Sequence, residues 1–281
     1  MSEWVELFEV GPRDGLQNEA SLISAQDKIA LVNLLSTAGF RRIEVASFVS
    51  PKWVPQMATS ADVLAGITRS EGISYAALAP NMRGLEGAIA ARADEVAIFG
   101  SASEEFSKAN INASIAESLE RFRPVAKTAI ERGVPVRGYI SCVINCPYNG
   151  PTDPVAVANV AWELHQMGCY ELSVGDTTGH AYPEEITKML RAVKDVVPDA
   201  VLAGHYHDTS GRALANIEAS LHEGVRVFDT SIGGLGGCPY APGALGNVAT
   251  ETVAERMLEL GYETGLNRDV LAQAARFAAS L

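Results

Sequence analysis

The sequence predicts a single (β/α)8 barrel, the TIM-barrel fold, with one extra helix at its C-terminal end. Two observations predict this fold. Short β-branched runs alternate with longer amphipathic runs, and eight of the short runs occur within roughly 250 residues. A doubly wound open sheet shows the same alternation, but no G-x-G-x-x-G motif follows the first run, which disfavours a dinucleotide-binding sheet. The eight predicted strands cover residues 4–10, 41–47, 73–79, 95–100, 134–141, 169–174, 200–207 and 225–231.

The runs between these strands are predicted helices, and the first of them carries its own start and stop signals. In "SAQDKIALVNLLSTAG", Ser24 is the predicted N-cap with Asp27 three residues later, and Gly39 can end the helix. The last run, "NRDVLAQAARFAAS", predicts the extra helix, which either caps the barrel or meets a partner subunit. Because no low-complexity linker interrupts the pattern, we expect residues 1–281 to form one catalytic domain.

Composition narrows the class of protein. Of 281 residues, 47% are hydrophobic, enough for a core without disulfides, and the net charge of −12 disfavours binding to nucleic acid or anionic membranes. The four cysteines are typical of a reducing compartment; Cys142 and Cys146 stand four apart with no second pair, which disfavours a zinc site. No apolar run has the length of a membrane span, and the first predicted strand begins at Trp4, so we expect a cytoplasmic protein.

Polar residues at the ends of the predicted strands are the candidates for chemistry, because barrel active sites lie at the carboxyl ends of the strands. Glu44 alternates with apolar neighbours in its strand and should point into the barrel. His205 and His207 share one strand face, with Tyr206 on the other, so they are either a packed polar pair or two metal ligands. Barrel closure brings the first and seventh strands near each other across the eighth, which makes Asp14 a candidate third ligand.

Asn247, in the glycine-rich stretch that follows the eighth strand, could add a carbonyl oxygen to these ligands. Two imidazoles, one carboxylate and one amide oxygen suit Mg²⁺ or Mn²⁺ at least as well as Zn²⁺. Arg13 is either a surface cation or the partner of a buried acid such as Glu44.

Five motifs resemble the 3-hydroxy-3-methylglutaryl-CoA lyase family, and the likeness runs from about residue 5 to about residue 265. They are "EVGPRDGLQNE", "IEVASFVSPKWVPQM", "GYISCVINCPYNG", "HYHDT" and "GLGGCPYAPGALGNVATE". The resemblance implies a metallolyase barrel with a divalent cation, which cleaves 3-hydroxy-3-methylglutaryl-CoA to acetoacetate and acetyl-CoA. It also implies an acyl-CoA substrate, a role in leucine degradation and ketone-body formation, and a homo-oligomer, with a dimer as the guess from the family.

The same resemblance assigns roles to individual residues. Arg13 and Gln17 are expected to contact the substrate. The expected metal ligands are Asp14, His205, His207 and Asn247, and the expected catalytic residues are Arg13, Asp14, Glu44, His205 and Cys238.

The implied reaction is a retro-Claisen cleavage that leaves the enolate of a thioester. With the substrate hydroxyl acidified by the cation, either Asp14 or His205 can take its proton. Arg13 suits the developing negative charge on the thioester oxygen. Cys238 suits the protonation of the enolate carbon, since the glycines around it let its loop open for the substrate and close over it.

Three alternatives stay open at this point. The enzyme could act on a longer or branched 3-hydroxyglutaryl-CoA, or it could be a Claisen-type synthase on the same barrel, although such synthases usually extend well past the barrel. A catalytically silent barrel that binds acyl-CoA is the third, and the intact set of candidate catalytic residues argues against it.

Overall fold

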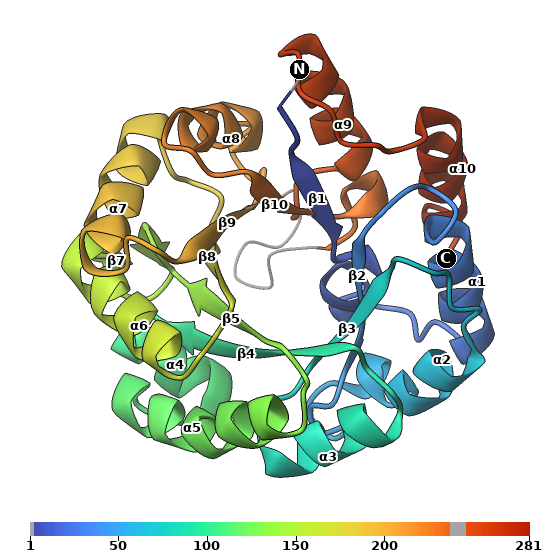
Figure 1. Ribbon diagram of the computed structural model, residues 1–281, viewed down its shortest axis with the longest axis horizontal. Coiled ribbons are helices and arrows are strands. Elements are labelled where there is room, and N and C mark those ends of the chain that lie inside the picture. The colour runs from blue at the N-terminus through green and yellow to red at the C-terminus, as the bar shows by residue number, and fades with distance from the viewer. Residues whose placement is uncertain (1–2, 237–245) are drawn as a thin grey trace.

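The structure is a computed structural model that describes residues 3–236 and 246–281. Eight parallel strands close into a barrel in the order β1-β10-β9-β8-β5-β4-β3-β2, and helices surround it (Figure 1). The predicted (β/α)8 fold is therefore confirmed. The strands of the barrel are β1 (Glu6–Glu9), β2 (Arg42–Ser47), β3 (Ser74–Leu78), β4 (Glu95–Ser101), β5 (Val136–Ser141), β8 (Glu171–Asp176), β9 (Val201–Tyr206) and β10 (Val227–Thr230).

Each barrel strand falls within or beside its predicted run. The structure adds a short antiparallel hairpin, β6 (Asn145–Cys146) and β7 (Gly150–Pro151), whose two-residue strands are too short to show a period in the sequence. Its Cys146 packs with Cys142 and Phe106, and both thiols are buried.

The helices follow the strands around the outside of the barrel. Ser24 caps the first of them by accepting a hydrogen bond from the Asp27 N–H at 3.1 Å, and Gly39 adopts a φ of +99° beyond its end, as predicted. The α-helices are α1 (Ala25–Leu35), α2 (Ser60–Gly66), α3 (Met82–Ala90), α4 (Glu104–Ile111), α5 (Ile115–Glu131), α6 (Pro154–Gln166), α7 (Pro183–Val196), α8 (Ala213–His222), α9 (Thr250–Glu259) and α10 (Arg268–Ala278); three short turns are η1 (Gly11–Gly15), η2 (Pro55–Met57) and η3 (Ile232–Gly234).

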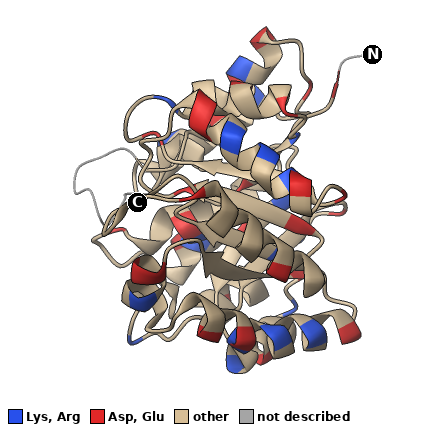
Figure 2. Cartoon of the chain, turned by 90° about the vertical axis from the view of Figure 1, so that its left-hand side faces the viewer, with Lys and Arg blue, Asp and Glu red and all other residues tan. Residues whose placement is uncertain are grey.

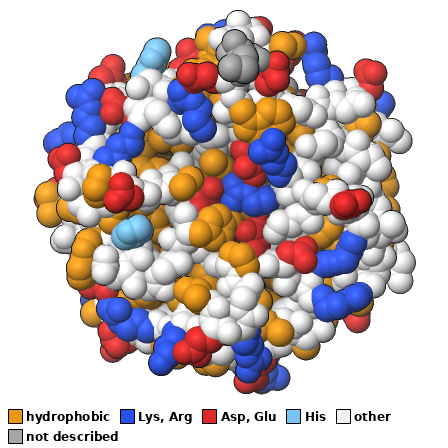
Figure 3. Space-filling view, viewed as in Figure 1, with side chains coloured by type: hydrophobic (Ala, Val, Ile, Leu, Met, Phe, Trp, Pro, Cys, Tyr) orange, Lys and Arg blue, Asp and Glu red, His pale blue; other side chains and the backbone are white. Residues whose placement is uncertain are grey.

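The extra C-terminal helix is α10. It lies in the outer ring against α1, α9 and η3 rather than across an end of the barrel (Figure 1). Within the described residues, no helix is both long and apolar enough to cross a membrane. Lys and Arg are interspersed with Asp and Glu along the helices in Figure 2, and side chains of both signs also gather at the centre of the face in Figure 3.

The apolar core lies between the barrel and its helices, whereas the inside of the barrel is largely charged. Arg42 donates to Glu6 at 2.6 Å and to both oxygens of Glu171 at 3.0 Å, and Arg137 donates to Glu171 at 2.6 Å. Glu6, Arg42 and Glu171 are each the first residue of their strand. Barrels of this class are usually filled by branched apolar side chains, so these paired charges need a reason.

Candidate active site and metal centre

A cavity of about 670 Å³ lies at the carboxyl ends of the barrel strands. It is lined by five of the predicted site residues, Arg13, Asp14, Gln17, His205 and His207. Asn247 is hydrogen-bonded to Asp14, and Glu44 to Arg13. The structure therefore brings together all the predicted site residues that it describes. Apolar side chains also line the cavity, among them Val49, Val54, Leu78, Phe99 and Phe106, alongside polar ones such as Asn81 and Arg121.

The turn η1 aims Arg13 and Asp14 into this cavity. The N–H groups of Arg13, Asp14 and Gly15 all point at the Val10 carbonyl oxygen, at 3.1, 2.7 and 3.2 Å. Neither end of this turn, Gly11 or Gly15, has room for a side chain. A Cβ on Gly11 would lie 2.5 Å from Glu9 Oε1, and one on Gly15 would lie 2.7 Å from Ser231 Oγ.

Arg13 is the partner of a buried acid rather than a surface cation. Its Nε donates to Glu44 Oε2 at 2.6 Å, and its Nη1 donates to Asp14 Oδ1 at 2.7 Å. Glu44 is fully buried and points into the barrel, as its alternation predicts. The second oxygen, Glu44 Oε1, has no hydrogen-bond partner among the described residues. The guanidinium is thus fixed from two sides at the edge of the cavity.

Asp14, His205 and His207 form a cluster that could hold a metal ion. The Nε2 atoms of the two histidines approach to 3.4 Å, and Asp14 Oδ2 lies 3.9 Å from His205 Nε2. One donor atom from each of the three residues lies within 4.8 Å of the others. Tyr206 points the other way and meets Ser220 on α8 at 2.8 Å, so the predicted division of strand faces is confirmed.

Asn247 approaches the same cluster from the segment after β10. Its Nδ2 donates to Asp14 Oδ2 at 2.9 Å, and its backbone forms a bridge with His207. Convergent imidazole, carboxylate and amide groups are the donor set that a divalent cation of the Mg²⁺ or Mn²⁺ type accepts. The residues present therefore fit such an ion.

The protonation of two of the three cluster residues, His207 and Asp14, suits cation binding. Burial lowers the pKa of His207 to about 4, and the neighbouring His205 adds to this effect, so the ring is neutral at physiological pH. Burial alone would raise the pKa of Asp14, but the charges of Arg13 and His205 outweigh it and lower that pKa to about 2. Burial lowers the pKa of His205, but the hydrogen bond with Asp229 and the charges of Asp229 and Asp14 together outweigh this effect and leave the pKa raised.

Two residues of this site were missed by the sequence analysis. Asp229 Oδ2 lies 3.1 Å from His205 Nδ1, and Arg137 donates to both Asp229 oxygens at 3.1 and 2.7 Å. The signal that predicts Glu44 could have found both, because each is a charged residue inside an apolar strand run, "VRVFDTS" and "VPVRGYIS".

Glu9 is a third missed residue, and it joins the segments that carry the site. One oxygen accepts from the N–H groups of Gly11 and Ile232, both at 2.8 Å, and the other accepts from Thr250 Oγ1 at 2.7 Å. Gly11 begins the turn that carries Arg13, while Ile232 and Thr250 flank the segment that contains Asn247. Burial raises the pKa of Glu9 to about 7, although these hydrogen bonds oppose the rise.

The remaining predicted residues are Gln17 and Cys238. Gln17 lines the cavity, and its Oε1 is buried without a partner among the described residues, so it could accept a hydrogen bond from a ligand. Cys238 lies outside the described residues.

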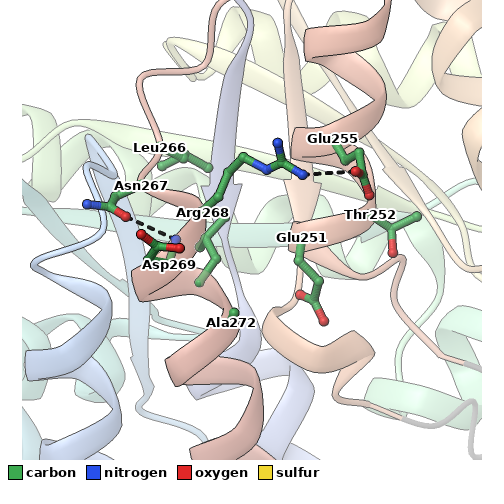
Figure 4. Close-up of a pocket in the computed structure, with 9 residues that line it drawn as sticks. Glu251, Thr252, Glu255, Leu266, Asn267, Arg268, Asp269 and Ala272 are labelled. Atoms are coloured by element: carbon green, nitrogen blue, oxygen red, sulfur yellow. Dashed lines mark hydrogen bonds and ion pairs between the residues drawn. The ribbon is translucent and has the colours of Figure 1, made fainter.

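A second hollow, of about 740 Å³, lies between α9 and α10 (Figure 4). Arg268 points across it to Glu255 at 2.9 Å, and Asn267 caps α10 by accepting from the Asp269 N–H. None of the predicted site residues that the structure describes lines this hollow.

The fold and the site define a (β/α)8-barrel protein with a candidate divalent-cation centre beside a buried arginine. The model of the HMGL-like family matches residues 4–278, and the chain belongs to this family. The resemblance seen in the sequence motifs is therefore confirmed.

Known proteins similar to this chain span nearly all of it. A protein of Pseudomonas aeruginosa named 3-hydroxy-3-isohexenylglutaryl-CoA/hydroxy-methylglutaryl-CoA lyase is 57% identical over 272 residues, which cover 97% of this chain and 91% of that protein. The crystal structure of the HMG-CoA lyase from Brucella melitensis is 57% identical with a TM-score of 0.98, and the match covers 99% of both chains. The structure of an HMG-CoA lyase from Acinetobacter baumannii in complex with coenzyme A and 3-methylmalate is 36% identical with a TM-score of 0.93, covering 99% of this chain and 90% of that one.

Proposed function

We propose that this chain is a carbon–carbon lyase that uses Mg²⁺ or Mn²⁺ and cleaves 3-hydroxy-3-methylglutaryl-CoA to acetoacetate and acetyl-CoA. The observation that carries the proposal is the convergence of Asp14, His205 and His207 beside Arg13 within one cavity. The HMG-CoA lyases of similar sequence and structure support it. An acyl-CoA substrate also agrees with the coenzyme A bound in the similar Acinetobacter baumannii structure.

In this proposal Asp14, His205, His207 and Asn247 hold the cation. When bound, the cation acts as a Lewis acid toward the substrate hydroxyl. Asp14 or His205 accepts the hydroxyl proton, and both lie at the cavity wall where the substrate would sit.

Arg13 stabilises the negative charge that develops on the thioester oxygen, and Glu44 holds the guanidinium in place for that task. Gln17 supplies a polar contact to the substrate. Cys238 protonates the enolate carbon, a role that its family motif supports.

A second candidate substrate is a 3-hydroxyglutaryl-CoA with a longer branched group at carbon 3. The apolar residues that line the cavity, such as Leu78 and Phe99, favour it, because such a group needs an apolar surface to leave water. The name of the Pseudomonas aeruginosa relative covers both kinds of substrate.

The cellular setting is also proposed. We place the enzyme in leucine degradation and ketone-body formation, in the cytoplasm, as a homo-oligomer that is a dimer by analogy with its family. The few cysteines support a reducing compartment. One contiguous apolar core around one barrel supports a single domain over residues 1–281.

The test is a direct assay of the purified chain with 3-hydroxy-3-methylglutaryl-CoA and Mg²⁺ or Mn²⁺, in which acetoacetate and acetyl-CoA are both quantified. Equal amounts of the two products, abolished by a chelator, are expected. Binding of coenzyme A esters without turnover would instead identify a silent barrel. Condensation of acetyl-CoA with a keto acid, without cleavage, would identify a synthase. A parallel assay with the longer 3-hydroxyglutaryl-CoA ranks the two substrates by kcat/KM.

A further inference from the structure

The carboxylate of Asp229 is the part of the site that no sequence motif singled out. Asp229 lies on β10 directly beside His205 on β9, where the two residues are register partners, and both side chains point into the barrel. Its side chain is fully buried. It does not line the cavity, so it can act there only through its hydrogen-bond partners. Of these, Ser173 and His205 line the cavity, and His205 belongs to the candidate cation cluster.

Asp229 makes four hydrogen bonds that hold its two oxygens in place. Oδ1 accepts from Arg137 Nη2 at 2.7 Å. Oδ2 accepts from Arg137 Nη1 at 3.1 Å and from Ser173 Oγ at 2.7 Å, and it lies 3.1 Å from His205 Nδ1. Arg137 is in turn held by Glu171 at 2.6 Å, so the carboxylate cannot rotate away from the histidine without breaking this chain of bonds.

These contacts determine which nitrogen of His205 carries the proton. Asp229 forms a buried ion pair with Arg137, whose guanidinium donates to both of its oxygens, and Ser173 donates to one of them, so the side chain meets these partners as a carboxylate. An ionised carboxylate only accepts hydrogen bonds, so Nδ1 of His205 has to be the donor. In the neutral ring, Nε2 then carries a lone pair, and this atom faces Asp14 and His207.

We propose that Asp229, anchored by Arg137, is a positioning residue that fixes His205 as the Nδ1–H tautomer and thereby presents its Nε2 to the cation. This inference rests on the proposed cation centre, and it leaves Asp14 as the acceptor of the hydroxyl proton, because neither ring nitrogen of His205 is then free. His207 has no such support, because its Nδ1 has no hydrogen-bond partner among the described residues. The two histidines are therefore unequal: His205 is oriented before the ion arrives, and His207 is oriented largely by the ion itself.

The first test measures Mn²⁺ affinity of the metal-free protein, by the free Mn²⁺ signal in electron paramagnetic resonance. Asp229→Asn keeps the size of the side chain but removes its charge. The amide N–H2 group of the asparagine then faces one of the present hydrogen-bond donors and cannot accept from it. We expect its Kd for Mn²⁺ to rise roughly 10- to 100-fold, the usual effect of losing a group that orients a metal ligand. The matched control is Glu95→Gln, which removes a buried carboxylate. Glu95 lies at the other end of the barrel, accepts a hydrogen bond from Tyr170 and does not contact His205. The control is expected to bind Mn²⁺ with the wild-type Kd.

At saturating Mn²⁺, Asp229→Asn should keep a larger share of its kcat than at limiting Mn²⁺, because the defect lies in presenting the ligand. An Asp229→Asn protein that folds and binds Mn²⁺ with the wild-type Kd would overturn the inference while leaving the cation centre intact. Failure of the wild-type protein to bind Mn²⁺ at all would instead count against the proposed function.

A second test needs no variant at position 229, so it holds even if Asp229→Asn does not fold. Nitrogen-15 labelling of the five histidines, with His205→Gln to assign the signal, reports the protonation of the His205 ring in the metal-free wild-type protein at about pH 9. We expect a neutral ring protonated at Nδ1. Any other protonation pattern of this ring overturns the inference.

Discussion

The buried carboxylate of Glu9 should make the stability of this protein fall as the pH rises through neutrality. Its pKa is about 7 in the folded chain and 4.5 as the reference for the unfolded chain. Between these values the folded state binds the proton that the unfolded state has lost, so the free energy of unfolding decreases with pH. From about pH 5 to about pH 8 the two pKa values give a loss of about 2.5 kcal/mol from this one group.

Glu9→Gln removes this contribution and is expected to fold. Glutamine resembles the protonated form of Glu9: its oxygen can accept from the N–H groups of Gly11 and Ile232, and its amide can donate to Thr250 Oγ1. The variant should therefore lose about 2.5 kcal/mol less than the wild-type protein over the same range of pH.

The assay is urea unfolding at about pH 5 and about pH 8 with a chelator present, so that cation binding does not contribute. The exposed Glu71→Gln variant controls for the loss of one negative charge. A wild-type protein and a Glu9→Gln variant that lose the same free energy of unfolding between the two pH values would refute the reasoning.

Three further outcomes concern the proposed chemistry. His207→Ala should weaken cation binding by roughly 10-fold or more, measured as the Kd for Mn²⁺ of the metal-free protein, because one of the four proposed donors is lost; an unchanged Kd would remove His207 from the ligand set. Arg13→Lys should lower kcat by about 10²-fold with a modest change in KM, since lysine lacks the planar fork that reaches Glu44 and the substrate together; a large rise in KM at constant kcat would assign Arg13 to binding instead. Cys238→Ser should lower kcat by roughly 10²-fold with Mn²⁺ affinity retained, because the hydroxyl is a far weaker acid than the thiol; near-normal turnover would mean that the proton comes from another group, and loss of the metal would make the thiol a ligand.

The positions of the strands and the division of their faces were predictable, because both follow from the period of the side chains along a strand. Alternation placed Glu44 inside the barrel, and it placed His205 and His207 on one strand face with Tyr206 on the other. The structure confirms both placements. The contact between Asp229 and His205 was not predictable in this way. It depends on the register between two strands that α8 separates in the chain, and alternation within one strand carries no information on register.

The geometry of the turn η1 could not be predicted from the sequence for a different reason. The pattern "GPRDG" indicates a sharp turn, but the convergence of three N–H groups on the Val10 oxygen depends on how closely Gly11 and Gly15 approach Glu9 and Ser231. Glu9 ends the strand before the turn, but Ser231 follows β10 and is distant in the sequence, so packing against that distant segment helps to decide where Arg13 and Asp14 point.

The charged side chains inside the barrel are better explained by the orientation that they give to other side chains than by a gain in folding stability. A buried ion pair recovers little more than the cost of removing its charges from water, and apolar side chains of the same volume would serve the barrel at least as well. Arg137 and Arg42 nevertheless fill that space, and together with Glu171 they connect the amino ends of the strands to Asp229. Hydrogen bonds fix angles as well as distances, whereas apolar contacts fix only distances. In the proposed cation centre, Nε2 of His205 has to face the cation before the cation is bound, so the ring needs a fixed angle. The paired charges of Glu171, Arg137 and Asp229 would provide that constraint.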